Sequence, residues 1–231
     1  MGKLKEQMDV VIGHSLVDIE ARFTKIRSEE TNISAWYAKM CLFETKAEMC
    51  IINSGTFRED RVVEKGEIKL AHAKRLFPME EKMVVIEVGG EKIHEALENG
   101  VSSYESCDGR FCAVAGVKFK WNRSLPAYER IRKEDIYFVK YDYETGEERE
   151  EPLDYGRSYK LCVKSYLAHG KDGYVSLLNP LRCLVDEESA LSVFQHYTLT
   201  FTQFDLSNSH TTNQVSHHIA NKIRFLGSSL H

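Results

Sequence analysis

A short polar loop after an apolar run offers the first side chains that could do chemistry. Met49–Ile52 is too short for a helix and is typical of a buried strand. It runs into Asn53-Ser54-Gly55, a turn signal in which Gly55 can take a positive φ without steric cost. Asn53 carries a two-way hydrogen-bonding amide, and Arg58 a planar cation that can fork onto anionic or vicinal oxygens. The loop predicts a ligand site at a sheet edge; a tight turn closed by a surface arginine is the alternative.

A second polar loop, His169–Tyr174, contains a carboxylate and follows a tyrosine. Asp172 suits the hydroxyl groups of a sugar, and Tyr166 offers an aromatic face on which a flat base can stack. Together with the amide and the cation of the first loop, these groups predict a site for a sugar that carries a base. A core tyrosine with a satisfied hydroxyl group is an equal alternative for Tyr166.

The histidines and the known catalytic motifs give little support for independent catalysis. The chain contains no G-x-S-x-G segment, no phosphate-binding P-loop and no zinc-protease pattern. His169 is isolated in sequence, and an esterase that uses it as catalytic base is a further hypothesis. We therefore predict neither a catalytic residue nor a metal site in this chain. Four histidines of the polar tail are interpreted as solvated: His210, His217, His218 and His231.

Length and composition limit the class of protein. The 231 residues suffice for one large domain or two small ones, and a hydrophobic content of 42% is ordinary for a globular protein. The net charge of −4 provides no general attraction for a nucleic-acid polymer or an acidic membrane. No apolar run is long enough for a membrane span, and the N-terminus has no signal sequence. Six cysteines without a C-x-x-C pair predict reduced thiols, which favours a cytoplasmic location.

The elements around the two loops predict an α+β fold. Helices follow strands too irregularly for a doubly wound sheet, which favours mixed β-sheets layered with helices. Strands are expected at Met49–Ile52, Met83–Val88, Phe111–Trp121, Ile136–Val139 and Tyr159–Ala168. Helices are expected over residues 4–12, Ile33–Cys41 behind a Thr31 cap, Leu70–Leu76, and Glu91–Asn99 with Asn99-Gly100 as its end. Other segments are expected to be extended (Val17–Arg27), an exposed turn (Glu147–Glu151), a polar mobile loop (205–218) and a final short element (Ile219–Leu226).

At these loops the chain resembles the C-terminal domain of the 5′-nucleotidase family, which includes UDP-sugar hydrolases and 2′,3′-cyclic phosphodiesterases. The likeness runs from about Asp18 to Tyr174. Its motifs, in family order, are Arg27-Ser28-Glu29-Glu30-Thr31-Asn32, Asn53-Ser54-Gly55-Thr56-Phe57-Arg58, Gly66-Glu67-Ile68, Ala96–Ser102, Gly109-Arg110-Phe111 and Tyr166–Tyr174. The resemblance implies an α+β substrate-binding domain over residues 18–185, behind an interdomain linker helix (1–17) and before a C-terminal extension (186–231).

The resemblance also implies roles for six residues. The amide and the arginine of the first loop would bind ribose and phosphate oxygens, helped by the arginine of the first motif. One aromatic ring and one carboxylate would hold the base and the ribose hydroxyls. The second ring of the family's base sandwich is replaced by a methionine, whose sulfur packs on a base more weakly than a ring does. The implied residues are the amide Asn53 and the arginine Arg58 of the first loop, Arg27 of the first motif, the ring of Tyr166, the carboxylate of Asp172 and the methionine Met79. Lys171 and Lys39 also depart from the family pattern.

Catalysis in the family belongs to a separate N-terminal metallophosphoesterase domain that holds two divalent metal ions. None of the motifs of that domain occurs here. The resemblance therefore implies a chain without a cofactor of its own, which binds an AMP-like or UDP-sugar-like ligand and does not hydrolyse it alone. The alternative is a divergent binding or scaffold module that kept the fold and lost the nucleotide pocket.

Overall fold

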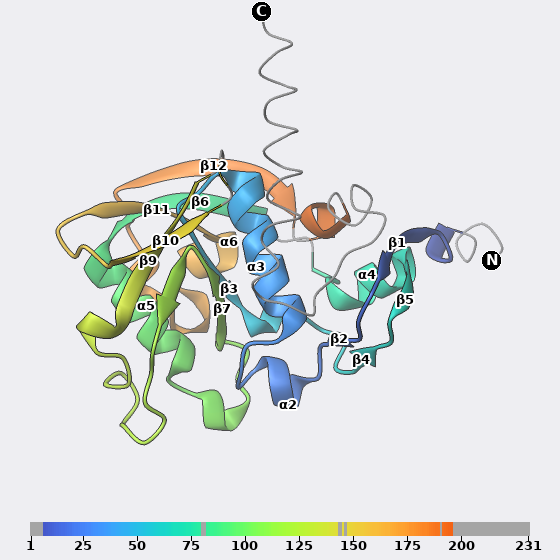
Figure 1. The fold of residues 1–231 in the computed structure, drawn as a ribbon, viewed down its shortest axis with the longest axis horizontal. Helices are drawn as coiled ribbons and strands as arrows, with labels where there is room; N and C mark the ends of the chain where they lie inside the picture. Colours follow the sequence, from blue (N-terminus) through green and yellow to red (C-terminus); the bar gives the residue numbers. More distant parts are fainter. Residues whose placement is uncertain (1–6, 80–81, 143–144, 146, 190, 196–231) are drawn as a thin grey trace, which may run out of the picture.

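A five-stranded mixed sheet forms the centre of the molecule (Figure 1). The computed structural model describes residues 7–79, 82–142, 145, 147–189 and 191–195. The strand order is β12-β6-β11-β3-β7, in which β11 runs parallel to β3 and the other neighbours are antiparallel. The strands are β3 (Met49–Asn53), β6 (Lys82–Gly89), β7 (Cys112–Ala115), β11 (Ser158–Lys164) and β12 (Arg182–Ser189). This mixed sheet confirms the predicted α+β class.

Two long helices cover opposite faces of this sheet, because successive side chains of a strand point to opposite sides. Cys50 and Ile52 of β3 belong to a core cluster that contains the buried face of α3 (Asn32–Thr45). Met49 and Ile51 belong to a second cluster, which contains the buried face of α5 (Gly90–Val101). Figure 1 shows α3 across one face of the strands. The result is a helix–sheet–helix arrangement in which every residue of β3 is buried.

Three smaller sheets surround the central one. A three-stranded antiparallel sheet has the order β10-β9-β8, and two strand pairs, β1-β5 and β2-β4, gather with α4 at one end of the molecule (Figure 1). Their bounds are β1 (Val11–Ser15), β2 (Ile19–Glu20), β4 (Val62–Val63), β5 (Gly66–Lys69), β8 (Val117–Phe119), β9 (Ile136–Tyr141) and β10 (Glu148–Pro152). Short helices are α2 (Phe23–Ile26), α4 (Leu70–Leu76), α6 (Ser165–Ala168) and the 3₁₀ turns η1 (Ser54–Thr56), η2 (Tyr104–Ser106), η3 (Lys133–Asp135), η4 (Lys171–Gly173) and η5 (Val175–Leu177).

Several sequence-based expectations are confirmed. Thr31 caps α3, where it forms a capping box with Ser34. The expected strands of β3, β6 and β9 and the helix α4 are present at the expected places. Beyond β12, residues 191–195 are helical, and the Phe194 ring packs edge-on against Trp36 at 5.7 Å between centroids. None of the helices in the described residues combines the length and apolar character needed to cross a membrane.

Other expectations are wrong, and backbone geometry explains most of them. The expected helix over residues 4–12 cannot extend past residue 10, because Val11–Ser15 is a strand paired with β5. The expected strand Phe111–Trp121 is broken at Gly116, which has φ +72° and meets the Glu48 carbonyl so closely that a Cβ would overlap it. The acidic run Glu147–Glu151 is not a turn but mostly strand β10, a charged edge strand.

Three further elements end differently from the expectation. The segment Val17–Arg27 contains both β2 and the short helix α2. Helix α5 continues through Asn99-Gly100 to Val101, and Gly100 packs on Cys112 so tightly that no Cβ would fit. The last expected strand, Tyr159–Ala168, stops at Lys164 and continues as α6. The predicted polar loop over residues 205–218 and the final short element lie outside the described residues.

Candidate functional site

Asn53 is the last residue of β3, and its side chain is fixed at both ends. The residue is 2% exposed, its Oδ1 accepts a hydrogen bond from Thr56 Oγ1 at 3.0 Å, and its Nδ2 donates to Asp172 Oδ2 at 2.7 Å. The turn η1 follows directly and brings Thr56 back toward the strand end. The sequence correctly placed Asn53 at the end of a buried strand.

Gly55 lies where two loops approach one another closely. A Cβ on Gly55 would lie 3.0 Å from Asn53 Nδ2 and 3.3 Å from the Gly109 carbonyl oxygen. The Gly55 amide donates to that same oxygen at 2.8 Å. The turn does not use the positive φ that a glycine permits. Gly55 is not among the positive-φ glycines of the described chain. The glycine lets the loop of Asn53 lie against the loop of Gly109.

Asp172 lies in the second predicted loop, which follows α6. Three residues of this loop have left-handed backbones: Gly170 at φ +73°, Asp172 at φ +51° and Gly173 at φ +79°. Glycine adopts this conformation freely, and aspartate is among the few other residues that tolerate it. The turn brings the Asp172 carboxylate back toward α6 and the end of β3.

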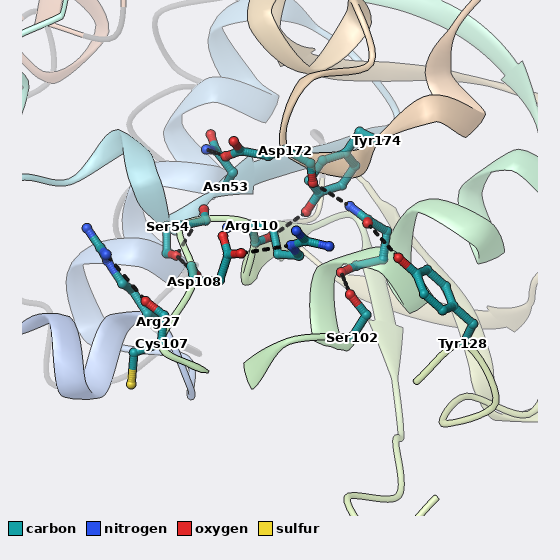
Figure 2. A network of polar contacts seen from close by, with 12 residues as sticks. Arg27, Asn53, Ser54, Ser102, Cys107, Asp108, Arg110, Tyr128, Asp172 and Tyr174 are labelled. Carbon is teal, nitrogen blue, oxygen red and sulfur yellow. Dashed lines mark hydrogen bonds and ion pairs between the residues drawn. The ribbon is translucent and has the colours of Figure 1, made fainter. Parts of the chain in front are cut away.

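Three of the predicted site residues meet at this carboxylate. Asn53 donates to one oxygen of Asp172, and the hydroxyl group of Tyr166 donates to the other at 2.9 Å. Asn53 and Asp172 are 119 residues apart in the sequence. The Tyr166 ring is 36% exposed, so the alternative of a buried core tyrosine does not hold. We call Asn53, Tyr166 and Asp172 the Asp172 site; Figure 2 shows Asn53 and Asp172 facing one another.

Arg27 directly follows α2, and its side chain reaches Cys107, two residues before Gly109. Its guanidinium lies over the Phe23 ring, 3.7 Å from the centroid. Its Nη1 donates to the Cys107 carbonyl at 3.3 Å (Figure 2). Its Nε is buried and has no hydrogen-bond partner among the described residues. Burial, and then the nearby charge of Arg58, lowers the pKa of Arg27. The two predicted arginines are therefore close enough for their charges to interact.

Arg58 is exposed and lines a hollow next to α4. Its backbone amide donates to the Leu76 carbonyl at 3.0 Å, which fixes the chain direction after η1. Within the described part of the chain, its guanidinium forms no hydrogen bond or ion pair. The hollow has a volume of about 540 Å³ and is lined by Arg58, Glu59, Arg61, Arg75 and Pro78. We call these five residues the arginine hollow.

Met79 lies outside the polar contacts of the Asp172 site. It follows Pro78, which lines the arginine hollow, and its side chain is 42% exposed. Lys39, one of the departures from the family pattern, lies elsewhere: its ammonium group pairs with Glu148 at 3.1 Å. The structure therefore separates the Lys39 departure from the candidate site.

Sequence reasoning missed the support behind Asp172. Asn99 of α5 is 3% exposed, and its Nδ2 donates to the Asp172 carbonyl at 3.0 Å. Tyr128 lies beyond it, with its hydroxyl group 3.5 Å from Asn99 Oδ1. The signal was available, because a buried amide interrupts the apolar face of an amphipathic helix. The local pattern of Asn99-Gly100 instead predicts a helix end.

Arg110 and Tyr174 complete this support. Arg110 Nε donates to Asp108 Oδ2 at 3.2 Å, and the Tyr174 hydroxyl donates to the Arg110 carbonyl at 2.7 Å (Figure 2). Burial raises the pKa of Tyr174 well above its ordinary value, so this hydroxyl stays protonated and remains a donor. Gly109-Arg110-Phe111 was recognised as a family motif, but no role followed from the sequence.

Comparisons with known proteins identify the class of domain. Residues 11–179 match a family model described as 5′-nucleotidase, C-terminal domain. The match covers more than half of the chain, and the chain belongs to this family.

Relatives with curated descriptions agree with the family. The trifunctional nucleotide phosphoesterase protein YfkN of Bacillus subtilis is 25% identical over 176 residues, which cover 74% of this chain and 11% of that protein. The 5′-nucleotidase of Mus musculus is 25% identical over 158 residues, which cover 68% of this chain and 27% of that protein. The chain thus spans less than a third of the length of either relative.

Solved structures show the same fold. A 5′-nucleotidase precursor from Thermus thermophilus superposes with a TM-score of 0.78 at 26% identity, over 87% of this chain and 38% of that one. The NAD nucleotidase of Haemophilus influenzae gives a TM-score of 0.72 at 17% identity, over 88% of this chain and 38% of that one. The second likeness concerns the fold alone.

Proposed function

We propose that this chain is the nucleotide-recognition domain of a 5′-nucleotidase-type metallophosphoesterase, which binds a nucleotide or nucleoside and does not hydrolyse it alone. The observation that carries the proposal is the Asp172 carboxylate, held between Asn53 and Tyr166. The family and the printed names of the relatives supply the ligand class. The proposal includes a cytoplasmic location, which the six unpaired cysteines favour.

Asp172 is suited to hold the two hydroxyl groups of a ribose. An ionised carboxylate offers about four acceptor sites, and the contacts with Asn53 and Tyr166 use two of them. The remaining sites can accept hydrogen bonds from vicinal hydroxyls without any rearrangement of the loop. Because Asn99 fixes the Asp172 backbone as well, the carboxylate is oriented before a ligand arrives.

The arginines and the ring would hold the other parts of the ligand. Arg58 is exposed and offers its fork of donors to phosphate oxygens, and Arg27 adds a second positive charge close by. The exposed face of Tyr166 would stack on the base, and Met79 would cover the other side through its thioether. These assignments follow the family motifs residue by residue, except that Met79 stands where the family has an aromatic ring.

Hydrolysis is assigned to a separate N-terminal metallophosphoesterase domain. Two divalent metal ions in such a domain clamp the phosphoryl oxygens and generate the nucleophile. Among the described residues of this chain, no group of three or more His, Cys, Asp or Glu could hold a metal ion. His169, the candidate base of the esterase hypothesis, is exposed, and its ring forms hydrogen bonds with Ser165 alone among the described residues.

Calorimetric titration with AMP, adenosine and UDP-glucose tests the proposal. We expect saturable binding of at least one of these ligands, weakened about tenfold or more in Arg58→Ala for those with a phosphate, because a charge-assisted contact is lost. Arg132→Ala is the matched control. Arg132 is an exposed arginine that pairs with Asp135, and neither residue belongs to the proposed site. No heat with any of the three ligands from a folded sample would support the scaffold alternative instead.

A further inference from the structure

The arginine hollow lies beside Arg58 and contains more positive charge than the proposed nucleotide site uses. Three of its five lining residues are arginines, and Glu59 is the single carboxylate among them. The sequence motifs and the family pattern gave no role to Glu59, Arg61 or Arg75. The hollow therefore needs an explanation of its own.

Glu59 holds two of these arginines in place. Its side chain is 1% exposed, and it accepts hydrogen bonds from Arg61 Nε at 2.5 Å and from Arg75 Nε at 3.0 Å. The arginine side chains remain 54% and 49% exposed. Because each contact uses Nε, the terminal amino groups of both guanidiniums stay available to a ligand; none of them bonds to a described residue. Glu59 thus fixes a pair of forked donors at the rim.

The charges around the hollow are not balanced. One carboxylate faces the guanidiniums of Arg58, Arg61 and Arg75, which leaves an excess of positive charge. Two neighbouring groups lie within the field of these arginines. Burial and then the charge of Arg58 lower the pKa of Arg27, against an opposing effect of Asp60. Burial and then the charge of Arg75 lower the pKa of His72, where Glu59 opposes them. An anion in the hollow would relieve this repulsion.

We propose that the arginine hollow is a second anion subsite, which takes the distal phosphate of a nucleoside diphosphate. The inference rests on the proposed function, because Arg58 would hold the first phosphate and also lines the hollow. Guanidiniums fork onto two phosphate oxygens at once, and two such forks are held in position here. A hollow of 540 Å³ is of the size that small-molecule groups occupy in proteins.

Calorimetric titration in metal-free buffer with a nucleoside, its monophosphate and its diphosphate tests this subsite. We expect the diphosphate to bind about tenfold more tightly than the monophosphate, and the advantage to shrink as salt screens the exposed arginines. Inorganic pyrophosphate should compete with the diphosphate and leave the affinity for the nucleoside unchanged. EDTA in the buffer keeps metal ions from masking the phosphate charge.

Single variants assign the effect to the two anchored arginines. Arg61→Gln and Arg75→Gln should each remove most of the diphosphate advantage while the monophosphate affinity changes by less than about twofold. They are made singly because each leaves Glu59 one guanidinium, so the buried carboxylate keeps a partner. Arg132→Gln is the control, since its Nε also donates to a carboxylate, that of Asp135 at 2.7 Å.

The outcomes separate this subsite from the proposed function. If monophosphate and diphosphate bind equally to the wild type, or if the advantage survives in both Arg61→Gln and Arg75→Gln, the subsite is wrong and nucleotide recognition stands. If none of the three ligands binds, both proposals fail. Should a glutamine variant not fold, Arg61→Lys and Arg75→Lys replace it; they keep the charge and remove the fork, and the same loss of advantage is expected.

Discussion

The Asp172 site and a groove beside α3 differ in how their polar groups are used. A groove of about 770 Å³ lies between the start of α3 and the strands β8 to β10, and its lining includes Trp121, Tyr137 and Lys118. We call it the Trp121 groove. Its charged groups neutralise one another: Lys118 pairs with Glu150 at 2.7 Å, and Lys39 with Glu148 at 3.1 Å. The Asp172 site is instead built around one carboxylate with acceptor sites to spare.

This difference teaches that size alone does not locate a binding site. The Trp121 groove offers volume and aromatic surface, but its ion pairs are partly exposed and of the kind that contributes little. At the Asp172 site, residues from β3, α5 and α6 converge on one loop, and each contact has a defined direction. Preorganised polar groups, and not volume, favour the Asp172 site as the place of recognition.

The largest expected effect comes from Asp172→Ala. It removes the acceptor of both Asn53 and Tyr166 and should weaken nucleoside binding about 100-fold. The free energy of unfolding should also fall by about 1–3 kcal/mol, because the buried Asn53 amide is left without its acceptor. Calorimetry and thermal unfolding measure the two effects. Glu150→Ala, a carboxylate of the Trp121 groove, is the control and should leave binding unchanged. Equal losses in the two variants would erase the distinction between the regions.

Removal of an aromatic ring should have the next largest effect. Tyr166→Ala should weaken binding of a nucleoside by about tenfold, because stacking on a base contributes roughly 1–3 kcal/mol. Tyr166→Phe keeps the ring and loses only the hydrogen bond to Asp172, so its loss should be smaller. Trp121→Ala removes the larger ring of the groove and should not change the affinity. A stronger loss in Trp121→Ala than in Tyr166→Ala would place the base in the groove.

Substitutions of two glycines with positive φ, one near each region, should distinguish an effect on ligand affinity from an effect on fold stability. Gly173→Ala would place a Cβ 2.5 Å from Asn99 Oδ1 at φ +79°, which should cost about 1–3 kcal/mol and also weaken binding several-fold by moving Asp172. Gly116→Ala, at φ +72° beside the groove, should destabilise the fold as well without affecting binding. Urea unfolding and calorimetry on both variants check this. Binding lost in Gly116→Ala and kept in Gly173→Ala would contradict the assignment.

The smallest expected effect is a pH dependence at His72, next to the arginine hollow. Its Nδ1 accepts a hydrogen bond from the Lys69 amide at 3.2 Å, and burial, with the charge of Arg75, lowers its pKa below 6.5. On acidification, His72 therefore binds a proton in the unfolded chain at a higher pH than in the folded chain. The contribution of His72 to the free energy of unfolding should be constant above neutral pH and should fall as pH drops through 6.5 toward the lowered pKa. In His72→Gln this contribution should vanish from the unfolding free energy measured between pH 5 and 8; His169→Gln is the control. A slope that persists in His72→Gln would assign it to another group.

The sequence predicts those parts of the fold in which local preference and tertiary packing agree. Thr31 and the apolar stripe behind it define α3, and the run Met83–Val88 defines most of β6. The break at Gly116 and the strand β10 depend on neighbours that no local pattern reveals: the Glu48 carbonyl in one case and the partner strand β9 in the other. Tertiary pairing overrides the turn-like composition of Glu147–Glu151.

The candidate site was predictable only in part for a similar reason. Asn53 and Asp172 were each recognisable as rim residues, but their meeting depends on β3 and β11 being parallel neighbours, which the sequence does not encode locally. The family resemblance implied only that both residues bind the same ligand. Asn99 was missed because it comes from a helix, and Arg61 and Arg75 because their common anchor, Glu59, is visible only in three dimensions.

Nuclear magnetic resonance of the ¹⁵N-labelled chain during titration with AMP tests the central claim most directly. Both regions carry a reporter: the side-chain amide of Asn53 and the backbone amide of Gly109 at the Asp172 site, and the indole N–H of Trp121 in the groove. We predict saturable shifts of the Asn53 and Gly109 signals with one dissociation constant, while the Trp121 signal stays in place. Shifts confined to Trp121, with Asn53 and Gly109 unmoved, would contradict recognition at the Asp172 site.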